Sequence, residues 1–327
     1  MNEKTSISFL CSPGMDSFLP DIMDELEKRG HNVYRCVDNT KEKVLYAIEK
    51  SKIIWIEWAA EFFPLSNGHY LDGKRVFVRL HSYEAFSDLV KMWDWTKIEA
   101  VIFVADHVKD LMCDKQPESF IDGSMGIGNP KLVVIPNAVN VGRFKDYPHA
   151  DGSKICWLGY INYKKGPQLL AEVFRRLAEI GPYTLDIGGP FQDERFRYYL
   201  NNYFDRHNIS SRVKFWGTVP RETVPSWLGQ FDYLLNCSVW EGDPVGVKEA
   251  MAAGTVPLVH AWPGAIKEMG AGCLVWENVT QLCSILKGIK DMTEIRKTCK
   301  LTASEYHLVH QVDAIEQLLG PPVLGVR

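Results

Sequence analysis

The chain has 327 residues, of which 46% are apolar, and this length is sufficient for two α/β domains, each with a hydrophobic core of its own. The formal net charge of -4 argues against a general nucleic-acid-binding protein, and no apolar run approaches the ~18 to 20 residues that cross a bilayer. The N-terminus is too polar for a signal peptide, and eight scattered cysteines without a C-x-x-C motif are typical of reduced thiols in a cytoplasmic protein.

Strand and helix patterns alternate through the first half of the chain. SISFLC predicts a strand, residues 17–29 predict an amphipathic helix that Gly30 ends, and NVYRCV predicts the next strand. Further short strands are predicted at KIIWIEW, RVFVRL, AVIFVA and KLVVIP. This alternation is typical of a doubly wound parallel sheet, so we predict a first Rossmann-like domain over residues 1–150.

A polar segment, YPHADGS at 147–153, predicts a linker, and the alternation begins again after it. Strands are predicted at KICWLG, TLDIGG, VKFWG, DYLLN and TVPLVH, with helices between them and a last helical stretch near residues 302–319. A second Rossmann-like domain is therefore expected over residues 151–302. Two such domains imply a cleft, and domain interfaces are common ligand sites. Neither half contains G-x-G-x-x-G, which disfavours a dinucleotide oxidoreductase.

The most informative segment is SVWEGDPVGVKEAMAAGTVPLVH, which predicts a turn, a helix ended by Gly254, and a strand. In a parallel sheet such a turn lies at the carboxyl end of the preceding strand, where ligands bind, and a helix start offers N–H groups to an anion or a sugar hydroxyl. Glu241 lies on the turn and Glu249 two helical turns further on. Both can therefore face one extended ligand, such as a nucleotide sugar.

The pattern E-G-x-P-x4-E-A-M-A-x-G resembles the E-x7-E signature of retaining glycosyltransferases with the GT-B fold, in particular glycosyltransferase family 4. The resemblance implies that Glu241 lies against the donor sugar and that Glu249 holds the ribose hydroxyls. The residues around them are then expected to contact the donor: Gly242, Asp243, Val245 and Gly246. It also implies a C-terminal helix at about 303–320 that packs back on the first domain.

WLGYINYKKGPQLLAEVF resembles the family's G-R-x(n)-K-G segment, in which a loop leads into a helix start. A cation at such a position suits a diphosphate, because the helix end supplies N–H donors and the ammonium neutralises charge. Lys165 matches the phosphate-binding lysine, and Lys164 is expected to supply a second charge. The family's arginine is replaced here by Tyr160, so the alternative expectation is a weaker affinity for the donor phosphate than in relatives.

VKFWGTVP resembles the strand and loop that hold the nucleotide base through backbone groups, which implies Trp216, Thr218 and Val219 near the base. Backbone recognition leaves the identity of the base undetermined. In LDIGGP the glycine pair either permits a close backbone approach or forms a simple tight turn.

In the first domain, FLCSPGMDSF places Gly14 on a loop like the family's donor-contacting glycine loop. RLHSYE places His81 at the end of a strand, where it resembles the family's histidine near the sugar and the acceptor. Arg79 and Glu84 flank it and are expected to pair with each other or to bind the acceptor. Two further acceptor-side candidates end the strand WIEW: Glu57 and Trp58.

The resemblance implies a retaining transfer of a hexose from a UDP or GDP sugar to an acceptor hydroxyl of a glycan, a lipid-linked molecule or a small molecule. Neither a metal nor another cofactor is expected, because the chain offers no D-x-D between strands, and Lys165 and helix N–H groups are expected to meet the diphosphate charge. Glu241 and His81 are expected to orient the sugar. The sequence is also compatible with contact between this protein and the surface of a membrane. Two alternatives are a nucleotide-sugar 2-epimerase and a non-catalytic partner subunit of the same fold.

Overall fold

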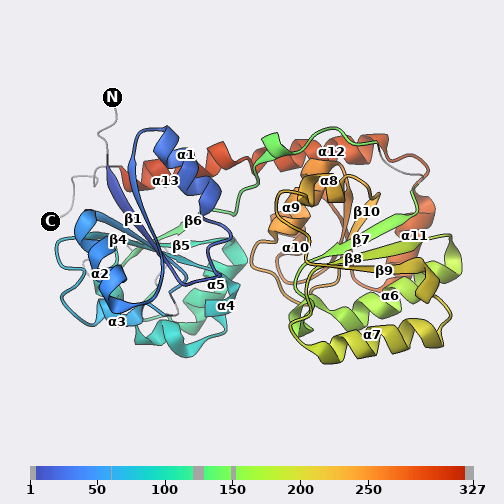
Figure 1. Ribbon diagram of the computed structural model, residues 1–327, viewed down its shortest axis with the longest axis horizontal. Coiled ribbons are helices and arrows are strands. Elements are labelled where there is room, and N and C mark those ends of the chain that lie inside the picture. The colour runs from blue at the N-terminus through green and yellow to red at the C-terminus, as the bar shows by residue number, and fades with distance from the viewer. Residues whose placement is uncertain (1–4, 60, 121–128, 149–151, 321–327) are drawn as a thin grey trace. The chain divides into compact units, whose positions relative to one another are not determined.

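The computed structural model describes residues 5–59, 61–120, 129–148 and 152–320, which form two compact units (Figure 1). The first unit is Met1–Asn137 together with the segment from Leu308 onward, and the second is Ala138–His307. Residues just after Asn137 thus group with the second unit, where Val139 forms a parallel bridge with His307. Parts of the expected linker at 147–153 and of the loop PESFIDGSMGIGNP at 117–130 lie outside the described residues.

The first unit contains a parallel six-stranded sheet in the order β2-β1-β3-β4-β5-β6. Its strands are β1 (Ser6–Cys11), β2 (Asn32–Val37), β3 (Ile53–Glu57), β4 (Arg75–Leu80), β5 (Ala100–Phe103) and β6 (Lys131–Val134). Its helices are α1 (Pro20–Lys28), α2 (Lys41–Lys50), α3 (Phe63–Ser66), α4 (Ser82–Ala85), α5 (Asp106–Lys115) and α13 (Leu308–Leu319). The central strands are continuous apolar runs because helices cover both faces of such a sheet.

Helix α1 is shorter than the sequence pattern predicts. It begins at Pro20 rather than at residue 17, because proline has no backbone N–H to donate and its fixed φ suits the first turn of a helix. Gly30, with φ of 95°, follows the helix end as expected. Helix α13 lies against α1 (Figure 1), and Arg29 pairs there with Asp313 and Glu316.

The second unit contains another parallel six-stranded sheet, in the order β12-β11-β10-β7-β8-β9. Its strands are β7 (Lys154–Leu158), β8 (Thr184–Gly188), β9 (Val213–Gly217), β10 (Tyr233–Asn236), β11 (Val256–His260) and β12 (Leu274–Trp276). Its helices are α6 (Pro167–Ile180), α7 (Glu194–Arg206), α8 (Val224–Leu228), α9 (Val245–Ala253), α10 (Ala265–Met269), α11 (Val279–Gly288) and α12 (Thr293–Glu305). The predicted α/β fold class with two doubly wound sheets is confirmed.

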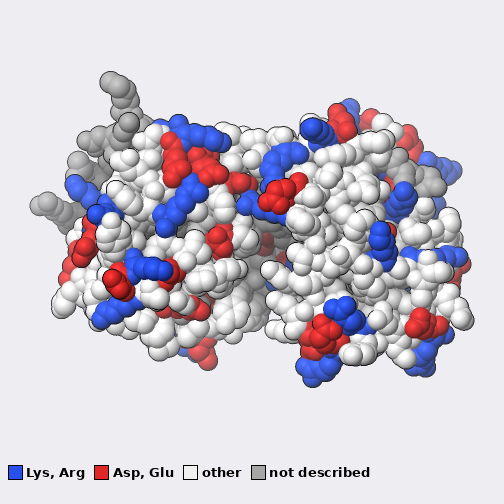
Figure 2. All heavy atoms as spheres, in the orientation of Figure 1, with Lys and Arg blue, Asp and Glu red and all other residues white. Residues whose placement is uncertain are grey.

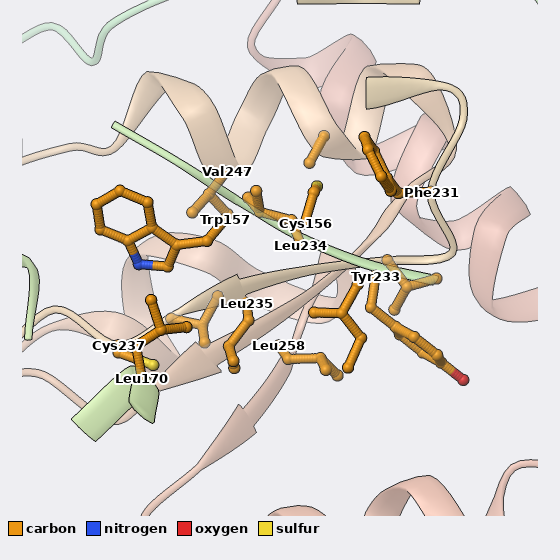
Figure 3. Packing of buried hydrophobic residues seen from close by; sticks show 14 of the residues in the cluster. Cys156, Trp157, Leu170, Phe231, Tyr233, Leu234, Leu235, Cys237, Val247 and Leu258 are labelled. Atoms are coloured by element: carbon orange, nitrogen blue, oxygen red, sulfur yellow. The ribbon is translucent and has the colours of Figure 1, made fainter. Parts of the chain in front are cut away.

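One hydrophobic core holds the second unit together. Helix α6 contacts α7 and α11, and α9 contacts α8 and α12, so helices pack around the sheet. Figure 3 shows part of this core, where Val247 of α9, Trp157 of β7 and Leu234 of β10 gather. Because each of these side chains is at most 3% exposed, α9 is fixed firmly on the sheet.

The predicted helix near residues 302–319 is interrupted. Helix α12 ends at Glu305 and α13 begins at Leu308, because the backbone between them bonds elsewhere. Val139 N–H donates to the carbonyl of Tyr306, and the Tyr306 hydroxyl donates to the carbonyl of Glu268. The interruption coincides with the passage from the second unit to the first.

Basic and acidic side chains lie side by side on the face of the molecule that Figure 2 shows, for example over α1, where Arg35 pairs with Asp24 and Glu27. Exposed pairs of this kind contribute at most ~1 kcal/mol each, so the fold depends on its two cores. Within the described part of the chain, no helix has the length and apolar character required to span a membrane.

Candidate functional site

Glu241 is the centre of a charged cluster in the second unit. Its side chain is buried on the loop after β10, and Lys165 Nζ lies 2.5 Å from Oε1. Lys164 Nζ lies 3.6 Å from Oε2, and the Ser238 hydroxyl donates to Oε1 at 2.6 Å. Burial opposes ionisation of Glu241, but the two lysine charges and these hydrogen bonds outweigh it and hold the pKa below its usual value. The carboxyl group is therefore ionised at neutral pH.

The order of the strands explains why these residues meet. Lys165 follows β7 and Glu241 follows β10, and these two strands are neighbours although 76 positions separate the two side chains. The chain runs from β7 to one edge of the sheet and returns to β10 on the other side. This is the topological switch point, where a doubly wound sheet has a crevice at the carboxyl ends of its strands.

Backbone contacts fix the lysine loop against the glutamate loop. Asn162 caps a short turn by accepting from Lys165 N–H, and Val239 N–H donates to the carbonyl of Lys164 at 3.0 Å. Gly166 has φ of 64°, and a Cβ atom there would lie 2.2 Å from the carbonyl oxygen of Cys237. Only glycine therefore permits this approach.

We expect Gly166→Ala to lower the free energy of unfolding by about 2 to 4 kcal/mol, because the new methyl group combines a backbone clash with an unfavourable φ. The matched control is Gly288→Ala near the end of α11, where a Cβ atom meets nothing within 4 Å. Urea denaturation of both variants measures the difference. Equal stability of the two would contradict the steric argument.

The start of α9 lies four residues after Glu241 and offers open N–H groups. Within the described residues, the N–H groups of Val245 and Gly246 make no hydrogen bond, and a Cβ atom on Gly246 would meet nothing within 4 Å. Glu249 is half-buried, as are these two residues, whereas the neighbouring Val247 and Lys248 are buried. Helical spacing therefore places Glu249 on the more open face of α9, together with Val245 and Gly246.

A second ion pair supports the same loop. Lys248 is fully buried, and its Nζ lies 2.6 Å from Asp243 Oδ1 and 3.9 Å from the centre of the Tyr306 ring. Asp243 is among the donor contacts expected from sequence, whereas Lys248 is not. In the structure the Lys248 ammonium group donates to the Asp243 carboxylate. Gly242, which lies between Glu241 and Asp243, is buried. The pair links this loop to α9 and to the end of α12.

The glycine pair after β8 permits a close approach of three loops. A Cβ atom on Gly189 would lie 1.8 Å from the carbonyl oxygen of Gly159, and Gly189 N–H donates to the carbonyl of Gly217. Of the two interpretations from sequence, the close approach is the correct one. It brings the loop after β9 to the same edge of the sheet as the loop after β7.

The residues expected near the base line a cavity of about 270 Å³ beside that loop. Trp216, Thr218 and Val219 line it together with Trp227 of α8. Trp216 is 41% exposed, its indole N–H donates to Asp186, and the Lys214 ammonium lies 3.5 Å from its ring centre.

In the first unit, the expected acceptor-side residues form a buried network at the ends of β3 and β4. His81 Nε2 donates to Glu57 at 2.6 Å, and Trp58 stacks on the imidazole with ring centres 3.9 Å apart. Arg79 donates to Glu57 and to Asn137. Burial opposes ionisation of Glu57, but the charge of Arg79 and the bond from His81 outweigh it and lower its pKa.

The expected pairing of Arg79 with Glu84 is wrong, because the Arg79 guanidinium group donates to the Glu57 carboxylate instead. The Glu84 carboxyl group instead accepts from the N–H groups of His81 and Ala59, each at 3.0 Å, and burial raises its pKa to about 8. Gly14 lies on a tight turn after β1, with φ of 79° and open space around its Cβ position. Trp58 has a left-handed φ of 67°, a strained conformation for a residue with a bulky side chain.

The cluster around Glu241 can bind an anion with an attached polar group. Two lysine charges exceed the single charge of Glu241, and the open N–H groups of α9 add a partial positive charge. The buried carboxylate beside them is suited to hydroxyl groups or to positive charge that develops on a reacting ligand. Two neighbours that the sequence analysis missed complete the cluster, Ser238 before the motif and His260 at the end of β11.

Comparison with known proteins agrees with this arrangement. Residues 143–299 match the model of the family described as glycosyl transferases group 1. A subunit of the phosphatidylinositol N-acetylglucosaminyltransferase of Arabidopsis thaliana is 30% identical over 136 residues, which cover 41% of this chain and 30% of that protein. The human protein of the same name is 28% identical over 186 residues, which cover 54% of this chain and 37% of that protein. The chain thus spans about a third of the length of these relatives.

Solved structures resemble the whole chain more closely in fold than in sequence. Anabaena Alr3699/HepE, crystallised with UDP and glucose, has a TM-score of 0.75 at 17% identity and covers 96% of this chain and 99% of its own. A UDP-forming trehalose-phosphate synthase from Burkholderia xenovorans has a TM-score of 0.75 at 14% identity, covering 96% and 98%. These likenesses establish the GT-B fold. Together with the family match they support a group 1 glycosyltransferase.

Proposed function

We propose that this protein transfers a hexose from a nucleotide diphosphate sugar to an acceptor hydroxyl, with retention of configuration and without a metal ion. The observation that carries the proposal is the buried Glu241 carboxylate, paired with Lys165 and Lys164 at the switch point of the second sheet. Residues 143–299, which match the glycosyltransferase model, contain all of this cluster.

The proposed roles follow from charge. Lys165, Lys164 and the first N–H groups of α9 neutralise the leaving diphosphate, while Glu241 lies against the sugar and Glu249 holds the ribose hydroxyls. Glu241 is ionised, so it can stabilise positive charge that develops at the anomeric carbon. In this front-face route the departing phosphate takes the acceptor proton. The diphosphate then leaves as the nucleotide product.

The proposed donor carries UDP, because Alr3699/HepE was crystallised with UDP and with UDP-glucose. The names of the two curated relatives favour an acceptor that carries a lipid. His81 remains proposed to orient the sugar together with Glu241, and the proposed acceptor-side residues remain Glu57, Arg79 and Trp58. A cytoplasmic location is proposed because all eight cysteines are free thiols.

We expect Glu249→Ala to weaken UDP binding about 10-fold to 100-fold, because the net loss of one charge-assisted hydrogen bond costs ~1.5 to 3 kcal/mol. Isothermal titration of wild type and variant with UDP, GDP and dTDP measures the loss and identifies the base. Glu222→Gln, an exposed site before α8, serves as the control. Unchanged UDP affinity in Glu249→Ala would remove Glu249 from the donor site.

A non-catalytic partner subunit is the second candidate. Tyr160 stands where the family has a phosphate-binding arginine and is 56% exposed, and both curated relatives are named as subunits. Incubation with UDP sugars, with and without lipid and glycan acceptors, separates the candidates by nucleotide release. Transfer requires the acceptor, a 2-epimerase converts the donor alone, and a partner subunit releases nothing.

A further inference from the structure

The loop that carries Glu241 is anchored by a histidine on the neighbouring strand. His260 is the last residue of β11, which pairs with β10 in parallel register, so His260 lies beside the first residues of that loop. Its Nδ1 lies 3.1 Å from the carbonyl oxygen of Ser238. A carbonyl oxygen only accepts, so Nδ1 carries the proton and donates it. The ring is half-buried and lies 4.9 Å from the Trp276 ring, which restrains its orientation.

The same serine holds the catalytic candidate. The Ser238 hydroxyl donates to Glu241 Oε1 at 2.6 Å, and Ser238 is only 1% exposed. Oε1 thus receives two donors, Ser238 and Lys165, whereas Oε2 faces Lys164. If Ser238 moved, Oε1 would lose this hydroxyl donor, and the carboxylate would be free to shift between the two lysines. The anchor at the Ser238 backbone therefore affects where the charge of Glu241 lies.

We propose that His260 is a positioning residue, which acts through Ser238 to hold the Glu241 carboxylate in its productive orientation. The inference rests on the proposed function of Glu241. His260 does not need to touch the donor for this role.

The test compares two substitutions that differ in one donor. His260→Asn keeps an N–H group near the position of Nδ1, whereas His260→Phe keeps the ring and loses the donor. We expect His260→Phe to lower kcat about 10-fold to 100-fold with an almost unchanged KM for the UDP sugar, because a small misplacement of a catalytic group reduces turnover to this extent. His260→Asn should restore kcat to within about threefold of wild type.

A double-mutant cycle shows whether the effect passes through Glu241. In a Glu241→Gln background, His260→Phe should lower kcat by less than about twofold, since the group that it positions is already changed. Equal losses in His260→Phe and His260→Asn, or a full additional loss in the Glu241→Gln background, would overturn the inference and leave His260 a structural residue.

A measurement that does not depend on sugar transfer distinguishes the role of His260 from the proposed function of the protein. In protein labelled with ¹³C-glutamate, the carboxyl signal of Glu241, assigned through Glu241→Gln, should shift in His260→Phe and return in His260→Asn. If wild type transfers no sugar but the signal behaves in this way, the proposed function fails and the anchor stands. If wild type transfers sugar and the signal is unmoved by His260→Phe, the anchor fails alone.

Discussion

Glu241→Gln is expected to lower kcat at least about 100-fold, because a neutral amide cannot stabilise positive charge at the anomeric carbon as a buried carboxylate does. Binding of UDP should be retained or become tighter. The substitution removes the negative charge of Glu241, which pairs with two lysines, and leaves their positive charges for the diphosphate. Steady-state transfer rates give kcat, and isothermal titration gives the affinity for UDP. The variant therefore separates chemistry from binding.

Two matched variants make this result interpretable. Glu222→Gln makes the same chemical change at an exposed position and should leave both quantities unchanged. Ser238→Ala removes only one hydrogen bond to Glu241 and should cost less than Glu241→Gln. The Glu241→Gln variant should fold, because the side chains of Lys164 and Lys165 are 35% and 22% exposed and water can solvate them. Wild-type turnover in folded Glu241→Gln would refute the proposed role of this carboxylate.

Lys248→Met is expected to reduce the free energy of unfolding by about 3 to 5 kcal/mol, the usual consequence of leaving one charge of a buried ion pair without its partner. Lys248 and Asp243 are 0% and 3% exposed, so solvent cannot replace the lost ammonium. The cation that faces the Tyr306 ring is lost as well. Urea denaturation measures the change.

Removal of both charges should be less harmful than removal of one. We expect Asp243→Asn/Lys248→Met to regain at least about half of the lost stability, because no isolated charge then remains in the core. Lys287→Met, at an exposed position of α11, changes the same residue type and should alter stability by less than about 0.5 kcal/mol. If the double variant is less stable than Lys248→Met, the pair is not the source of the effect.

These two sites differ in how far the sequence could predict them. Glu241 and Lys165 belong to segments with a recognisable order of residues, so each could be assigned to a ligand site without coordinates. Their direct contact could not be foreseen, because it depends on which strands are neighbours. The pairing of β7 with β10 across the switch point decides it.

The alternation of short apolar strands with helical segments indicated the α/β class and the strands of both sheets except β12, since periodicity is a local property of the chain. The glycine that ends α9 was likewise readable, because a left-handed backbone conformation favours one residue type.

Tertiary structure alone decided the contacts between residues far apart in the sequence. Arg79 pairs with Glu57 and not with Glu84, because β3 and β4 are adjacent strands and their register places Glu57 opposite Arg79. The His260 anchor depends on the register of β10 and β11. The predicted last helix is interrupted because the bond from Val139 N–H to the Tyr306 carbonyl and the bond from the Tyr306 hydroxyl to Glu268 form only once the chain has folded. Local propensity contains no information on such partners, and burial and strand order supply it.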